Sequence, residues 1–187
     1  MSAASAPFGF RPAYNPTGLD RAKKYTIAGS YGTAIYKGQP VILNTNGTIT
    51  VGTAAADLIG MFAGCEFVDA TGKPTVSNFW PAGQTILAGT VPVAWVYDDP
   101  EQVYEVQADG SVAQTAIGDQ ADVSNVGNNS GGQSTSTLSA TPAGAGVQAQ
   151  FRIVGFNQNL DNLPGDAFTI VQVKLARHQY IANKVAI

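Results

Sequence analysis

The chain has 187 residues, of which 44% are hydrophobic and only 12% charged, with a formal net charge of −3 and one cysteine. This length permits one domain, or one domain with a small additional lobe. A single cysteine excludes an intrachain disulfide, and no stretch approaches the roughly 18 apolar residues of a membrane-spanning helix. Residues 1–10 lack the charged and apolar regions typical of a signal peptide, so we expect none.

The low charge indicates a surface built from small polar and apolar residues, since soluble domains carry about 25% charged residues. Such a surface favours a protein that lies against neighbouring subunits, although a soluble β domain rich in small residues has the same composition. The charges are also segregated. Residues 1–40 carry five basic and one acidic side chain, residues 41–151 one basic and ten acidic, and residues 152–187 four basic and two acidic. This asymmetry predicts either head-to-tail contacts between copies or ends that fold back on the acidic middle.

Residues 1–30 are predicted to form an extended arm. Pro7, Pro12 and Pro16 exclude a helix and favour extended backbone. Disordered tails are usually poor in aromatic residues, so the aromatic residues here indicate that the arm is held against its own domain or a neighbour. We expect removal of the arm to spare the fold. The candidate partner-binding residues are the aromatic and basic side chains of the arm: Phe8, Phe10, Arg11, Tyr14, Arg21, Lys23, Lys24 and Tyr25.

Residues 31–187 are predicted to form a body of short β-strands. Asn46-Gly47 between two apolar runs is a strong hairpin signal, because both residues accept a positive φ. In the strand expected over residues 58–68, interior glycines indicate a close approach of another backbone. Further strands are expected over residues 85–88 and 91–97, and Pro92 predicts that the latter lies at a sheet edge or contains a bulge.

The second half of the body continues this pattern. Asp109-Gly110 predicts the turn of a hairpin between residues 103–107 and 111–114. At most one short helix is expected, near residues 117–123. A long flexible loop or loose hairpin outside the core follows over residues 124–146. Final strands are expected over residues 151–156 and 168–180. In the second of these, Val171, Val173 and Leu175 alternate with Gln172 and Lys174, the pattern of a strand with one apolar face. Turns at this spacing indicate an all-β fold, a small β-barrel or a sandwich.

The sequence offers little catalytic chemistry. The chain has one histidine, His178, which could act as a general base. No serine, however, lies in a Gly-x-Ser-x-Gly nucleophile elbow. Cys65, in an apolar strand, is expected to be a buried and inert thiol. Asp98-Asp99 could bind calcium, but the proline that follows favours a solvated turn. We therefore expect no catalytic residue, no metal ion, no cofactor, no small-molecule substrate and no direct contact with nucleic acid.

A family resemblance rests on the order of several short motifs. They are Phe8-Gly9-Phe10-Arg11-Pro12, Lys37-Gly38-Gln39-Pro40-Val41, Leu58-Ile59-Gly60-Met61-Phe62-Ala63-Gly64, residues 91–96, Asp98-Asp99-Pro100, residues 103–110, Ile117-Gly118-Asp119, Phe151-Arg152-Ile153-Val154-Gly155-Phe156 and residues 171–179, which end in Arg177-His178-Gln179. In this order the chain resembles the small head-decoration, or cement, proteins of tailed bacteriophages. Each motif alone has low specificity, and the resemblance extends along most of the chain.

The resemblance implies a β-tulip-like or small barrel body that binds the outside of a phage capsid. The implied partners are the major capsid protein and other copies of the chain, as a trimer or dimer. The implied location is the virion exterior, after synthesis in the host cytoplasm, with no membrane contact and no enzymatic activity. An alternative is another virion or surface module, such as a tail, fibre or carbohydrate-binding domain, with Trp80, Trp95 and Tyr97 as a stacking platform.

Overall fold

The structure is a computed structural model that describes residues 4–128 and 131–181, and these residues are all-β, as predicted. They contain no α-helix, only a 3-10 turn at Gln114–Ala116. The strands are β1 (Arg11–Tyr14), β2 (Lys23–Ile27), β3 (Ile35–Tyr36), β4 (Pro40–Leu43), β5 (Thr48–Val51), β6 (Gly60–Val68), β7 (Pro74–Ser77), β8 (Phe79–Trp80), β9 (Val93–Tyr97), β10 (Val103–Gln107), β11 (Gln120–Ala121), β12 (Val123–Asn125), β13 (Thr137–Leu138), β14 (Phe151–Phe156) and β15 (Ile170–Leu175).

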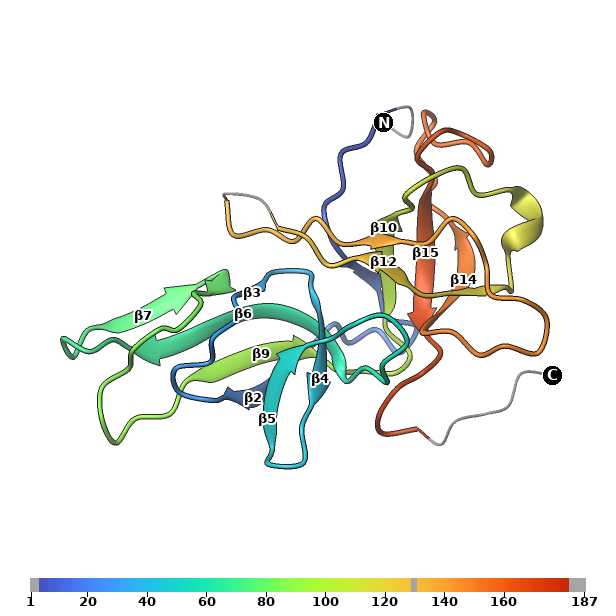
Figure 1. Cartoon of the computed structure of the whole chain (residues 1–187). Coiled ribbons are helices and arrows are strands. Elements are labelled where there is room, and N and C mark those ends of the chain that lie inside the picture. Colours follow the sequence, from blue (N-terminus) through green and yellow to red (C-terminus); the bar gives the residue numbers. More distant parts are fainter. Residues whose placement is uncertain (1–3, 129–130, 182–187) are drawn as a thin grey trace.

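Five strands close into a small barrel. They pair in the order β4-β5-β2-β9-β6, and β4 also pairs with β6, which completes the ring; β7 extends the sheet beyond β6. The pairings are antiparallel except for β2 with β5, where Thr26 faces Thr48 in parallel register. The small barrel expected from the sequence is therefore present, and it forms one side of the molecule in Figure 1.

Successive side chains of a barrel strand point alternately into the barrel and away from it, and the inward side chains fill the core. Ala94 and Val96 of β9 are fully buried, whereas Val93, Trp95 and Tyr97 lie on the outer face. Of the two alternatives predicted from Pro92, the edge strand is wrong, because β9 pairs with both β2 and β6, and the irregularity in the β6–β9 ladder lies in β6, between Phe62 and Gly64. The proline lies just before the strand, so its missing N–H removes no hydrogen bond from the ladder. The barrel core consists of buried residues from several strands: Ile27, Ile35, Val41, Ile49, Ile59, Phe62, Cys65, Phe67, Trp80, Ala94 and Val96.

A second module lies beside the barrel (Figure 1). Its sheet has the order β1-β10-β15-β14-β11, and the two-stranded pair β12-β13 covers it. As predicted, Val171, Val173 and Leu175 of β15 point inward. The core of this module contains residues of both modules: Phe10, Leu58, Met61, Tyr104, Val106, Ala108, Val112, Ala116, Ala121, Val123, Leu138, Phe151, Ile153, Val171, Val173 and Leu175.

Two turn predictions have different outcomes. The hairpin at Asn46-Gly47 is confirmed: β4 and β5 pair through Val41 and Val51, and Gly47 has a φ of 79°. The hairpin at Asp109-Gly110 is wrong, because β10 pairs with β1 and β15 instead. After β10 the chain turns to another partner: the N–H of Asp109 donates to Leu138, which is distant in sequence.

Three other local predictions are corrected. The helix expected over residues 117–123 is replaced by β11 and β12. The strand expected over residues 85–88 is reduced to one bridge between Ile86 and Asp69. Residues 124–146 were expected outside the core, but Leu138 is fully buried and Ser134 and Ser136 are buried and bonded to each other. Part of this low-complexity stretch is thus a hairpin that covers the second module.

Candidate functional site

The N-terminal segment lies against its own chain, one of the two placements left open by the sequence. β1 pairs with β10 in the second module, and β2 is a barrel strand between β5 and β9. Residues 11–27 therefore belong to the body. A deletion of residues 1–30 would remove a barrel strand rather than spare the fold.

Just before β1 and at its start, the segment forms one wall of a surface pocket at the junction of the modules, which we call the seam pocket. Its volume is about 300 Å³, and most of its lining is aromatic or aliphatic. Three of the predicted partner-binding residues, Phe8, Phe10 and Arg11, contribute to it. The lining residues come from the N-terminal segment, the barrel and the β12-β13 connection: Phe8, Phe10, Arg11, Pro12, Lys37, Gly38, Phe62, Tyr97 and Gln133.

Hydrogen bonds and ring stacking hold this pocket in shape. The N–H of Phe10 donates to Gly38 over 2.8 Å, and its ring stacks on Phe151 with centroids 4.5 Å apart. Gln133 Nε2 donates to the carbonyl oxygens of Phe8 and Lys37, at 2.7 and 3.0 Å. The pocket is therefore preformed by contacts among segments far apart in sequence, which lowers the entropic cost of binding a partner there.

The rim of the pocket is basic. Arg11 lies 4.9 Å above the Phe8 ring and donates to Glu105 over 2.6 Å. Burial opposes ionisation of Glu105, but hydrogen bonds from Arg11 and two amide side chains lower its pKa overall. Lys37, across the pocket, is exposed and forms no ion pair with the described residues. The pocket thus combines an apolar floor with the positive charge of Lys37 at its mouth, because Glu105 pairs with Arg11.

A second group of predicted residues gathers around Asp98. Its carboxylate accepts from Tyr25 over 2.6 Å and pairs with Lys23 at 3.2 Å. Tyr25 also contacts the hydroxyl of Tyr180 at 3.1 Å. Burial, followed by these hydrogen bonds, raises the pKa of Tyr25. Asp98 is buried rather than part of a solvated turn, and this cluster fastens the C-terminal segment to the barrel.

Of the remaining predicted residues, two join neither group: Tyr14 ends β1 with its ring about half exposed, and Lys24 is exposed on β2. Arg21 lines a surface pocket with Lys23 and Asp98 of the second group. The eight residues therefore lie at several places along the N-terminal segment and do not form one site.

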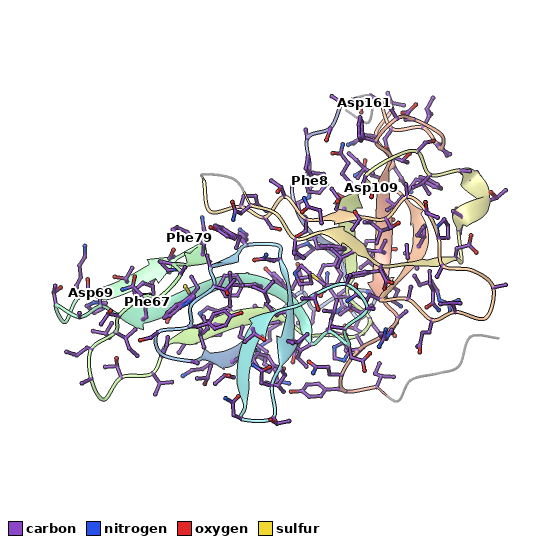
Figure 2. All side chains as sticks on the ribbon, viewed as in Figure 1. Phe8, Phe67, Asp69, Phe79, Asp109 and Asp161 are labelled. Carbon is purple, nitrogen blue, oxygen red and sulfur yellow. The ribbon has the colours of Figure 1, made fainter. Side chains whose placement is uncertain are left out.

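A structured loop that sequence reasoning missed carries exposed leucines. Residues 158–167, here called the knob loop, connect β14 to β15, and Figure 2 shows Asp161 at its outer end. Leu160 is 99% exposed and Leu163 61% exposed. A leucine in a polar loop carries no sequence signal of exposure, because the same residue is equally common in cores.

The potential catalytic residues are held in structural roles. Cys65 is buried, as predicted; burial raises the pKa of its thiol to about 12, and Sγ contacts the carbonyl oxygen of Phe79. Both ring nitrogens of His178 are bonded to backbone groups, of Asp98 and Tyr180. Among residues 4–128 and 131–181 no group of three His, Cys, Asp or Glu side chains could hold a metal ion, and no helix is long and apolar enough to cross a membrane.

The aromatic platform of the alternative hypothesis is not formed as expected. Trp80 is fully buried in the barrel core, where its indole N–H donates to Tyr31 and its ring meets Phe67 edge-on. Trp95 lies on the outer face and donates to Glu66 over 3.0 Å. The two tryptophans therefore point to opposite sides of the barrel wall.

No family model, curated protein or solved structure matches this chain.

Proposed function

We propose that this chain is a structural virion protein that binds the outer surface of a phage capsid and stabilises contacts between major capsid subunits. On this proposal its partners are the major capsid protein and other copies of itself. It works without catalysis and without a cofactor, at the exterior of the virion after synthesis in the host cytoplasm. One observation carries the proposal: apolar side chains are exposed at two separate ends of a rigid β body.

The first of these ends is the barrel-end patch, formed by Val76, Leu87 and Val91. Val76 on β7 is 79% exposed and Val91 is 63% exposed. Both line a shallow pocket of about 240 Å³ with Phe67 and Val93. This end of the barrel lies far from the second module in Figure 1, and Figure 2 shows Phe67 and Asp69 there.

The second end is the knob loop with Leu160 and Leu163. A body with one apolar contact at each end can touch two neighbours at once. Linking two weak contacts through one body raises the overall affinity, because the second contact forms at a high effective concentration. A surface with few charges loses little hydration when neighbours cover it. These properties suit a protein that bridges subunits of a shell.

The barrel-end patch is the proposed contact with the shell. We expect the double variant V76D/V91D to lose at least tenfold in affinity for capsids, because two charges would have to be buried at the contact. The measurement is co-sedimentation of the purified protein with virion shells that lack it. The matched control is I117D, which places a charge on a half-exposed side chain of the second module. Equal binding by V76D/V91D and wild type would contradict this contact, and no binding by wild type to any shell would contradict the proposed function.

A further inference from the structure

The knob loop is a built feature and not a loose connection. Asn162 belongs to the loop, but its side chain is buried. Its Nδ2 donates to the carbonyl oxygens of Asn157 and Ile170, and its Oδ1 accepts from the N–H of Ile170. The N–H of Gly165 also donates to Val112 over 2.8 Å. These bonds fix the base of the loop.

The same bonds hold the leucines outward. The N–H of Leu163 donates to Asp166, which closes a tight turn, and Leu160 stands 99% exposed beside it. The backbone that carries Leu160 is already ordered in the free protein. Burial of this leucine in a partner would therefore stabilise the contact without a further loss of backbone conformational entropy.

The seam pocket is the recess on this chain that matches such a knob. It has an aromatic and aliphatic floor, formed in part by Phe8, Phe62 and Tyr97, and a volume of about 300 Å³. It is open at the surface and shaped by the stacking and hydrogen bonds around Phe10.

Charge distinguishes the seam pocket from the pocket of the barrel-end patch. The segment from residue 153 to residue 173 contains two acidic residues, Asp161 and Asp166, and no basic residue. The charged residues that line the seam pocket are Arg11 and Lys37; Glu105 pairs with Arg11, so the net positive charge at the pocket comes from Lys37. In contrast, Glu66 lines the pocket of the barrel-end patch, where an acidic loop would be repelled.

We propose that the knob loop of one copy inserts Leu160 into the seam pocket of a second copy, with the acidic loop facing Lys37. The contact joins two different patches, so each copy offers one knob and one pocket. Such heterologous contacts build rings where the rotation closes, as a trimer requires. This inference deepens the proposed function by naming how copies contact each other, and it is tested in solution, without shells.

The first test is directed disulfide formation between two single variants, L160C and K37C, mixed under mild oxidation. The native Cys65 is buried, so the introduced thiols are the reactive ones. We expect a disulfide-linked pair that contains one chain of each variant, at least tenfold more abundant than either variant alone forms with itself. The control is V147C mixed with K37C, since Val147 is exposed outside the knob loop. If the control mixture cross-links as efficiently, the proposed contact is wrong.

The second test is self-association by analytical ultracentrifugation. We expect L160D and K37E each to weaken association at least tenfold, because one places a charge in the apolar floor and the other turns the rim acidic. V147D should associate like wild type. A monomeric wild type, or an L160D variant that associates as tightly as wild type, would overturn the inference. Shell binding through the barrel-end patch would remain unaffected by that result.

Discussion

The side chain of Phe10 packs in the core of the second module and so holds the N-terminal segment against it. It is fully buried, its ring stacks on Phe151, and its N–H donates to Gly38 of the barrel. Phe8, two residues earlier, is only partly buried and has its ring against Arg11. Both phenylalanines line the seam pocket, but only Phe10 is also a fully buried core residue.

This difference predicts their effect on stability. Phe10→Ala should lower the free energy of unfolding by about 3–5 kcal/mol, because it removes a buried ring and leaves a cavity. Phe8→Ala should cost less than half as much. Urea denaturation of both variants measures the difference. Equal losses for the two would mean that the ring of Phe10 does not join the core.

His178 is the residue that makes stability depend on pH near neutrality. Its Nδ1 accepts from the N–H of Tyr180, so the ring is neutral, with its proton on Nε2 facing the carbonyl oxygen of Asp98. Burial lowers its pKa from the ordinary 6.5, although the carboxylates of Asp98 and Asp99 and the bond to Asp98 oppose this. The folded state therefore resists protonation more than the unfolded state does.

The sign of the pH effect follows from this lowered pKa. Below about pH 6.5 the unfolded chain takes up the proton and the folded chain does not, so stability falls as the pH falls. We expect wild type to lose more stability than His178→Gln between about pH 7 and pH 5.5. Urea denaturation at each pH gives the comparison, and shared carboxylates cancel in it. Parallel pH profiles for the two proteins would contradict the role of His178.

Among the elements, β6 shows most clearly why glycine is needed. Gly60 lies where β4 closes the barrel against β6, opposite Val41. A Cβ at this position would lie 2.0 Å from the carbonyl oxygen of Tyr97 on β9. The sequence predicted a close backbone approach at this glycine, and the structure confirms it. The partner strand, however, could not be inferred from the residues of β6.

This contact predicts that Gly60→Ala destabilises the barrel by at least about 3 kcal/mol, since the backbone of β9 would have to move. The matched control is Gly144→Ala, where a Cβ meets nothing within 4 Å and the change should stay within about 0.5 kcal/mol. Thermal unfolding followed by tryptophan fluorescence reports on the barrel, because Trp80 and Trp95 both lie in it. A stable G60A protein would show that β9 lies farther from β6 than described.

For the whole molecule, the two modules share one core. Leu58 and Met61 come from the barrel side of the chain but are fully buried in the hydrophobic cluster of the second module. Leu58 also pairs with His178 near the C-terminus. The N-terminal segment supplies a strand to each module, which joins them a second time.

We therefore expect the chain to unfold as a single cooperative unit. Met61→Ala should lower stability by about 2–5 kcal/mol in both modules. Tryptophan fluorescence measures the barrel, and hydrogen exchange of the β15 amides measures the second module. Two transitions, with only one shifted by M61A, would mean that the modules unfold independently.

The sequence by itself determined the properties that depend on neighbouring residues. Alternation in residues 171–175 predicted their inward face, Asn46-Gly47 predicted its hairpin, and the density of prolines excluded a helix near the N-terminus. It also brought Phe8, Phe10 and Arg11 to attention, and these three residues do meet at one pocket.

Only the tertiary structure decided which strands pair and which surfaces remain open. The second partner of β10 is β15, more than 60 residues away, and not the stretch after Asp109-Gly110. Leu138 is buried within a low-complexity stretch, whereas Leu160 is exposed within another loop. Local sequence does not distinguish these cases, because pairing and burial depend on distant segments that each residue meets only after the chain has folded.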